Sequence, residues 1–135
     1  MDKALKILIV EDDFTSRVML QEAMNRHGVC HVATNGLEAV VAFQDALQNN
    51  TPYHLVFLDI LMPEMDGQET LKRIRAIEEE AGIMIGRGTK IIMATGHTDS
   101  KNIMESFNEM CDAYLVKPIH VDKLNRELKA LGLIA

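Results

Sequence analysis

Acidic, hydroxyl and ammonium side chains follow four short apolar segments of this chain. An acidic triplet, Glu-Asp-Asp at 11–13, comes directly after the first segment, and Asp59 follows a later one. Thr95 and Lys117 end two further apolar segments. Carboxylates that lie close together repel one another and cannot all stay ionised without positive charge nearby. If these segments meet in space, Lys117 offsets one unit of charge, and a divalent cation offsets two more.

Such a cluster has the chemistry of phosphoryl transfer. Asp59 offers a nucleophilic oxygen, while Lys117 and Thr95 offer groups that bind phosphoryl oxygens. Mg²⁺ suits a site of this kind, because it binds through one or two carboxylates and several waters. A single acid at a strand end is more often a loop charge or a helix cap. The combination of complementary groups at four strand ends therefore carries the prediction of an aspartyl phosphate.

These residues need a scaffold that brings them together, and alternating strand and helix patterns provide one. Apolar runs predict strands at residues 7–10, 29–33, 54–58, 90–94 and 113–116. Apolar residues at helical spacing predict intervening helices around 19–24, 37–47, 71–77, 103–107 and 121–131. Five strand-then-helix units favour an α/β fold with an open, doubly wound, five-stranded parallel sheet and helices on both faces. The carboxyl ends of the strands then meet at one edge, where functional groups gather.

Composition agrees with one compact domain and excludes several other classes. The 135 residues are 47% hydrophobic and 25% charged, which is typical of soluble globular proteins and not of disordered chains. Fourteen basic and twenty acidic residues give a net charge of −6, which opposes binding to nucleic acid or anionic membranes by bulk charge. The sequence shows neither a membrane-spanning run nor a signal peptide, so we expect a cytoplasmic location.

Four stretches resemble the receiver domain of bacterial two-component response regulators, in the style of the single-domain chemotaxis regulators. They are ILIVEDD at 7–13, LVFLDILMPEMDG at 55–67, IIMATG at 91–96 and DAYLVKP at 112–118. The resemblance covers the whole chain and implies a flavodoxin-like sheet of order 2-1-3-4-5. It also implies Mg²⁺ dependence and phosphotransfer from a sensor histidine kinase or a histidine phosphotransfer protein. We therefore expect residues 1–135 to form one receiver domain, with no output domain in this chain.

The resemblance assigns roles around the metal. Asp59 resembles the phosphoacceptor, Asp12 the acid that binds Mg²⁺ directly, and Glu11 its partner acting through water. Leu61 is expected to offer its backbone carbonyl to the metal. Asp13 also borders the pocket, so the acid pair could be Asp12 and Asp13. The pair Glu11 and Asp12 is favoured because an arginine, at 17, follows Asp12 at the spacing usual in the family.

The resemblance also assigns a switch. Thr95 resembles the hydroxyl that binds the phosphoryl group and moves, Lys117 the phosphoryl-binding lysine, and Tyr114 the aromatic residue that follows the hydroxyl. Lys117-Pro118 is expected to be a cis peptide. The moving surface comprises the fourth helix, fifth strand and fifth helix, which would bind a downstream protein target or support a phosphorylation-dependent dimer. The sequence does not identify the kinase or the target.

Two positions are expected to tune the lifetime of the phosphorylated state. Leu61 and His97 lie two residues after the phosphoacceptor and two after the switch hydroxyl, where the resemblance indicates that they border the path of attacking water. Leucine offers no hydrogen bond to water, so we expect slow hydrolysis. His97 could orient water or shield the phosphoryl group, and shielding is favoured.

The sequence departs from the family pattern at residues 78–89, which are longer than is typical. Its glycines at 82, 86 and 88 suggest a flexible connection, and the three glutamates at 78–80 suggest a solvated charge run. A partner-specific surface is the alternative for this segment.

Two other functions use similar folds. A phosphohydrolase of the haloacid-dehalogenase type also has an aspartate nucleophile at a strand end, but it needs a second aspartate where this chain has Leu61. A flavin or nucleotide binder would hold phosphate after the first strand, where the acidic triplet would repel it. A receiver domain is therefore the preferred interpretation. Such a domain is a signalling phosphoacceptor rather than an enzyme that turns over a substrate.

Overall fold

The computed structural model describes residues 4–60, 62, 64–84, 86–96 and 110–135. Its sheet has five parallel strands in the order β2-β1-β3-β4-β5, as the family resemblance implies. The strands are β1 (Leu5–Val10), β2 (Gly28–Ala33), β3 (Leu55–Asp59), β4 (Lys90–Thr95) and β5 (Ala113–Val116). The described helices are α1 (Phe14–Asn25), α2 (Gly36–Gln48), α3 (Gly67–Glu80) and α5 (Val121–Ala130). The α/β fold with a doubly wound sheet is confirmed.

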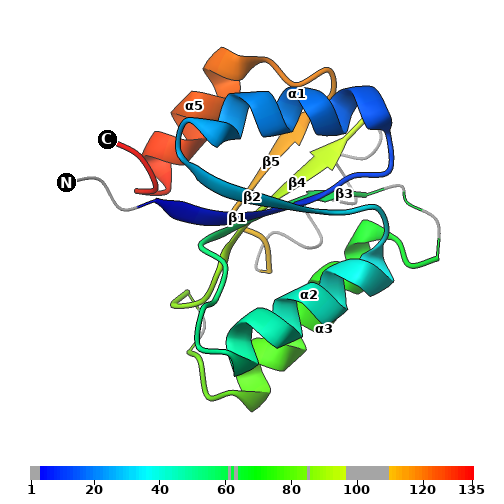
Figure 1. Ribbon diagram of the computed structural model, residues 1–135, viewed down its shortest axis with the longest axis vertical. Helices are drawn as coiled ribbons and strands as arrows, with labels where there is room; N and C mark the ends of the chain where they lie inside the picture. Colours follow the sequence, from blue (N-terminus) through cyan, green and yellow to red (C-terminus); the bar gives the residue numbers. More distant parts are fainter. Residues whose placement is uncertain (1–3, 61, 63, 85, 97–109) are drawn as a thin grey trace.

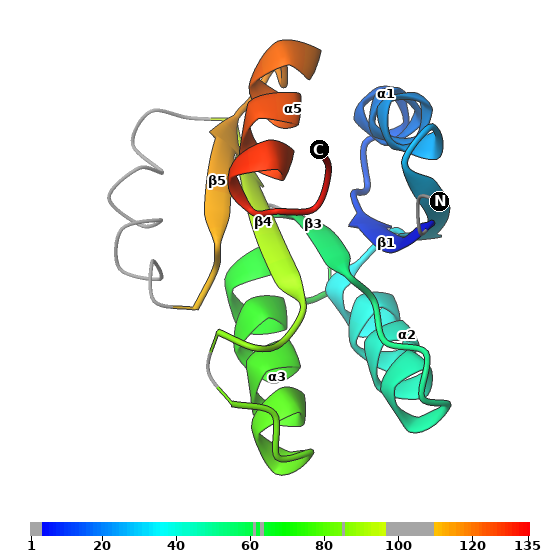
Figure 2. The same cartoon turned by 90° about the vertical axis from the view of Figure 1, so that its left-hand side faces the viewer.

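The helices cover both faces of the sheet. α1 and α5 lie on one face, and α2 and α3 lie on the other (Figure 1). The same division is visible after a quarter turn (Figure 2). Alternation along β1 explains it, because Ile7 and Ile9 pack into the cluster beneath α1 and α5, whereas Leu8 and Val10 pack into the cluster beneath α2 and α3. A strand that is buried on both faces has a continuous apolar sequence, as β1 does.

Three helices begin at a side chain that caps their first turn. Asp13, Asn35 and Asp66 each accept a hydrogen bond from the backbone N–H three residues later, at 2.8–2.9 Å. Such caps satisfy amide groups that have no partner inside the helix. They fix where α1, α2 and α3 start, directly after the loops that leave the carboxyl ends of β1, β2 and β3. None of the helices in the described part of the chain has the length and apolar composition needed to cross a bilayer.

Several sequence-based expectations fall outside the described residues. Residues 103–107, where a helix is expected, are not among the described residues, and neither are Leu61 and His97. The cis peptide expected at Lys117-Pro118 is present.

Candidate functional site

The carboxyl ends of the strands bring three carboxylates together at one edge of the sheet. Glu11 and Asp12 follow β1 directly, and Asp59 is the last residue of β3. One carboxylate oxygen from each of these residues lies within 4.8 Å of the others. We call Glu11, Asp12 and Asp59 the acidic site. The register of β1 against β3, in which Val10 is opposite Leu58, places the residues that follow level with one another.

Lys117 brings a positive charge to the acidic site from the end of β5. Its Nζ lies 2.7 Å from Glu11 Oε1 and 3.4 Å from Asp59 Oδ1. Glu11 is 1% exposed and Asp59 is 7% exposed, so these contacts are largely screened from water. The ammonium thus bridges two buried carboxylates from strands that are not adjacent to β5.

The surroundings of Asp59 favour its neutral form. Burial is the main cause, the hydrogen bond and repulsion from Glu11 add to it, and Lys117 opposes it, so that the pKa of Asp59 rises to about 7. For Lys117, burial disfavours the charged ammonium, but the carboxylates of Glu11 and Asp59 outweigh burial and raise its pKa. One ammonium therefore does not balance the charge of three carboxylates, and the site is short of positive charge.

Asp13 has a different position from the two acids before it. Its exposed carboxylate accepts a 2.8 Å hydrogen bond from the backbone N–H of Ser16 at the start of α1, and this bond lowers its pKa. Its own backbone N–H donates to Glu11 Oε2 at 3.2 Å. Arg17 donates from Nη1 to the carbonyl oxygens of Glu11 and Asp12, at 3.1 and 3.4 Å. The structure thus joins Glu11 and Asp12 with Asp59, and it uses Asp13 as a helix cap.

A close contact behind Asp59 requires glycine. Gly67 begins α3 and donates its backbone N–H to the carbonyl oxygen of Ile60 at 2.8 Å. A side-chain carbon at position 67 would collide with the carbonyl oxygen of Asp59. The start of α3 can therefore pack directly against the backbone that carries the Asp59 carboxylate.

The structure places the predicted switch residues on the expected strands. Thr95 is the last residue of β4, and the backbone therefore brings it to the same edge as the acidic site. Tyr114 lies on β5, is half-buried and packs against the core beneath α2 and α3. Their roles in switching stay predictions, as do those of Leu61 and His97, which lie outside the described residues.

The donor set of the acidic site suits Mg²⁺. All three ligating groups are carboxylates, which are hard oxygen ligands, and their oxygens are close enough to share one ion. Asp12 is exposed, so the cluster is open to solvent on one side and leaves room for metal-bound water. The shortage of positive charge around Asp59 is a second feature that a divalent cation would relieve.

Sequence reasoning misread one part of the chain. The interpretation of residues 78–80 as a solvated charge run is wrong for Glu78, which is 5% exposed and paired with Arg75 at 2.6 Å. The Glu78 carboxylate also accepts a 2.7 Å hydrogen bond from the backbone N–H of Thr89. Helical spacing could have signalled this pairing, because Arg75 and Glu78 are three residues apart on α3. A cavity of about 790 Å³ lies beside these residues, at the opposite end of the sheet from the acidic site.

Comparisons with known proteins agree on one family. A sequence model of the response regulator receiver domain matches residues 7–129. The chain is 33% identical over 127 residues to the transcriptional regulatory protein SrrA of Staphylococcus aureus, covering 93% of this chain and 47% of that protein. It is 30% identical over 125 residues to probable histidine kinase 2 of Oryza sativa, covering 85% of this chain and 12% of that protein. The chain thus spans half or less of the length of these relatives.

A solved structure extends the similarity to three dimensions. The receiver domain of the response regulator Ssk1 from Saccharomyces cerevisiae, solved with the histidine phosphotransfer protein Ypd1, superposes with a TM-score of 0.78 at 25% identity. The superposition covers 98% of this chain and 91% of that one.

Proposed function

The chain belongs to the response regulator receiver domain family, whose members are signalling phosphoacceptors, and from that premise we propose that Asp59 accepts the phosphoryl group. The observation that carries the proposal is the position of Asp59, a buried carboxylate at the end of β3 with Glu11 and the Lys117 ammonium around it. The proposal treats all 135 residues as one receiver domain.

The proposed reaction is transfer of a phosphoryl group to a carboxylate oxygen. An Oδ atom of ionised Asp59 attacks the phosphorus of a phosphohistidine, and the O–P bond forms as the N–P bond breaks. The electron pair leaves with the imidazole nitrogen, which takes a proton from solvent. Lys117 holds a phosphoryl oxygen and also favours the ionised form of Asp59. Glu11, Asp12 and Asp59 would hold Mg²⁺, which when bound would supply positive charge that neutralises the phosphoryl oxygens.

The proposed phosphoryl donor is a histidine kinase or a histidine phosphotransfer protein, in line with the Ssk1 receiver domain, which was solved with such a protein. Phe14 supports a docking position at the start of α1. It follows the acidic triplet directly and is 69% exposed. The Arg17 guanidinium lies 5.5 Å from the ring centre, so an aromatic and a cationic group flank the acidic site together. An exposed aromatic side chain of this kind is typical of an anchor for a protein partner.

The proposed output is a change of the surface that includes β5 and α5. Phosphorylation would draw the Thr95 hydroxyl toward the phosphoryl group and allow the Tyr114 ring to move, which shifts the population between two existing arrangements. Val116 and Val121 are exposed apolar residues at the junction of β5 and α5, and they give a downstream protein or a second copy an apolar contact. The proposed location is the cytoplasm, where ATP is available as the phosphate source of histidine kinases.

The proposal includes a long-lived phosphorylated state. Leu61 and His97 carry over from the sequence as the residues beside the path of attacking water. Leu61→Asn is expected to speed loss of the phosphoryl group several-fold, for a barrier about 1 kcal/mol lower. Release of phosphate from the two proteins measures this, and equal or slower release from the variant contradicts it.

Incorporation of labelled phosphate tests the function. Incubation with labelled phosphoramidate should label the wild type to at most one phosphoryl group per chain when Mg²⁺ is present and weakly in EDTA. Asp59→Asn should take up none, while Asp66→Asn, which alters an exposed helix-capping acid, should be labelled normally. Sustained turnover of phosphate esters would instead favour the phosphohydrolase, which the family assignment does not support.

A further inference from the structure

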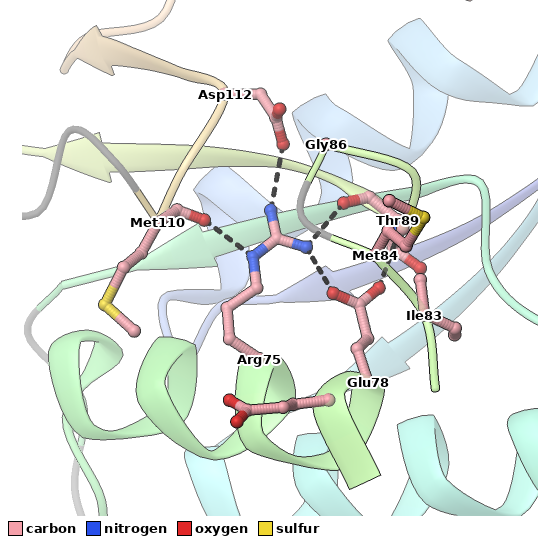
Figure 3. A pocket seen from close by; sticks show the side chains of 10 residues that line it. Arg75, Glu78, Ile83, Met84, Gly86, Thr89, Met110 and Asp112 are labelled. Atoms are coloured by element: carbon pink, nitrogen blue, oxygen red, sulfur yellow. Dashed lines mark hydrogen bonds and ion pairs between the residues drawn. The ribbon is translucent and has the colours of Figure 1, made fainter. Parts of the chain in front are cut away.

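A network of ion pairs lies at the opposite end of the sheet from the acidic site, where β4 and β5 begin. Arg75 on α3 is its centre, with its guanidinium between the carboxylates of Glu78 and Asp112 (Figure 3). Arg75 Nη1 lies 2.6 Å from Glu78 Oε1, and Nη2 lies 3.0 Å from Asp112 Oδ2. The guanidinium also donates to the carbonyl oxygens of Thr89 and Met110, at 2.9 and 2.6 Å. One side chain thereby connects α3 with the segments that precede β4 and β5.

Asp112 extends the pairing between β4 and β5 by one residue. Its backbone N–H donates to the Ile91 carbonyl oxygen at 2.9 Å, and its carboxylate accepts from the Ile91 N–H at 2.8 Å. The regular pairing begins one step later, with Ile92 opposite Ala113. Lys90 adds a longer contact, with Nζ 3.9 Å from Asp112 Oδ1. Asp112 therefore fixes the point at which β5 joins the sheet.

β5 depends on such a fixed point more than the other strands do. It has four residues, whereas each of the others has five or six, and in the described sheet it pairs with β4 alone. Leu115 is its one buried side chain, and Val116 is 49% exposed. Side-chain packing alone therefore gives only weak resistance to sliding of β5 along β4.

The guanidinium is itself held in place by the segment that sequence reasoning treated as flexible. Glu78 Oε2 accepts the N–H of Thr89 at 2.7 Å while Oε1 binds Arg75. Position 88 must be glycine for this arrangement, because any side-chain carbon there would collide with the Glu78 carboxylate. Thr89 Oγ1 donates to the Tyr53 carbonyl oxygen at 2.7 Å, which ties the same segment to the residues that precede β3. Contacts on two sides therefore hold the Arg75 guanidinium in an orientation toward Asp112.

We propose that Arg75 and Asp112 form a clamp that sets the position of β5 along β4, and through β5 the position of the Lys117 ammonium. Lys117 directly follows β5, five residues after Asp112, so the two ends of the strand are joined by extended backbone. The ammonium must reach both Glu11 and Asp59, at 2.7 and 3.4 Å, and a slide of β5 would change both distances. Arg75 is thus a positioning residue that acts through Asp112 on phosphoryl binding. The inference rests on the proposed role of Lys117 as the phosphoryl ligand.

The affinities for two ligands distinguish a displaced Lys117 from a general loss of structure. Beryllofluoride with Mg²⁺ mimics the phosphoryl group and needs the Lys117 ammonium, whereas Mg²⁺ alone binds the carboxylates of the acidic site. The chain contains no tryptophan, so both affinities are measured by titration calorimetry or amide NMR rather than by tryptophan fluorescence. Arg75→Met and Asp112→Asn should weaken beryllofluoride binding about fivefold while changing Mg²⁺ affinity little, a size within the range of coupling through packed networks. Arg75→Lys, which keeps the charge, should recover part of the loss.

Control variants make each outcome decisive. Arg73→Met removes the other arginine–glutamate pair of α3, which is exposed, and should change neither affinity. Lys117→Met tests the premise: if it leaves beryllofluoride binding intact, the proposed function of Lys117 fails. If Lys117→Met weakens beryllofluoride binding while Asp112→Asn does not, the clamp is wrong and the proposed function stands. If Arg75→Met does not fold, Asp112→Asn, which leaves the Arg75–Glu78 pair in place, decides alone. Equal loss of Mg²⁺ and beryllofluoride affinity would also overturn the clamp.

Discussion

Glu11 and Asp13 are two residues apart in the sequence, yet their carboxylates face different surroundings. Glu11 is buried beneath Lys117, whereas Asp13 is exposed and caps α1. The different surroundings arise because β1 ends at Val10 and α1 begins at Phe14. The residues between them belong to neither element, so their side chains point in different directions. A run of acids can thus contain metal ligands and a helix cap side by side.

Substitution of the two acids should separate these roles. Asp13→Ala should lower the melting temperature by about 3 °C through loss of the cap, with Mg²⁺ affinity nearly unchanged. Glu11→Gln should reduce Mg²⁺ affinity about tenfold, because it removes a full charge from the acidic site. Circular dichroism and Mg²⁺ titration measure the two effects. A larger loss of Mg²⁺ affinity in Asp13→Ala than in Glu11→Gln would assign the metal to Asp12 and Asp13.

The raised pKa of Asp59 predicts how the stability of the metal-free protein depends on pH. The unfolded chain loses this proton near the ordinary pKa of 3.8, but the folded protein keeps it until about 7. Between these values the folded state binds more protons, so this group lowers stability as pH rises, and the loss is complete above about pH 7. Asp59→Asn lacks the effect, so in EDTA at pH 8 its free energy of unfolding should exceed that of the wild type by up to about 4 kcal/mol, since each pKa unit corresponds to about 1.4 kcal/mol.

Urea unfolding at several pH values measures this difference. The advantage of Asp59→Asn should shrink steadily from pH 7 to pH 4. Glu69→Gln, which removes an exposed carboxylate from α3, should follow the wild-type profile. A constant difference at every pH would mean that burial of the Asp59 charge is not its cause.

At the scale of the elements, β5 connects the acidic site with the surface at β5 and α5. Lys117 lies at its end, Tyr114 is half-buried within it, and the exposed Val116 and Val121 lie at its junction with α5. Beryllofluoride should therefore shift amide NMR signals along β5 and into α5, as well as around Glu11 and Asp59. Shifts confined to the acidic site would contradict coupling through this strand. Signals of α2, which contacts α3, β2 and β1, serve as the internal reference.

The sequence predicts the order and type of the elements well, because each strand of the parallel sheet is a short apolar run with a polar group at its end. The five strands, the acidic site and the position of Lys117 all depend on such local patterns. The clamp could not be predicted in this way, because Arg75 and Asp112 are 37 residues apart and meet only after β4 and β5 pair. Glu78 was misread for the same reason: its burial comes from Arg75 and from a backbone N–H of a distant loop residue, Thr89.

At the scale of the whole molecule, the two ends of the sheet differ in how their charges are balanced. The Arg75 network contains its own counter-charges, whereas the acidic site has three carboxylates and one ammonium. The net charge of −6 adds to this imbalance. Binding of a divalent cation to the folded state alone therefore stabilises the whole domain.

Thermal unfolding in a Mg²⁺ titration should show this stabilisation. At one hundred times its dissociation constant, Mg²⁺ should add about 2.7 kcal/mol to the free energy of unfolding. Asp12→Asn should lose most of the gain, because Asp12 is a ligand of the proposed metal and is too exposed to be needed for packing. An equal gain in wild type and Asp12→Asn would place Mg²⁺ elsewhere on the surface.

Chemical mapping of the phosphorylated residue tests the central claim most directly. After phosphorylation by a small phosphodonor with Mg²⁺, borohydride reduces an aspartyl phosphate to homoserine, which peptide mass spectrometry locates in the chain. The account predicts homoserine at position 59 in the wild type and none in Asp59→Asn. Homoserine at position 12 or 13, or unchanged labelling of Asp59→Asn, would contradict it.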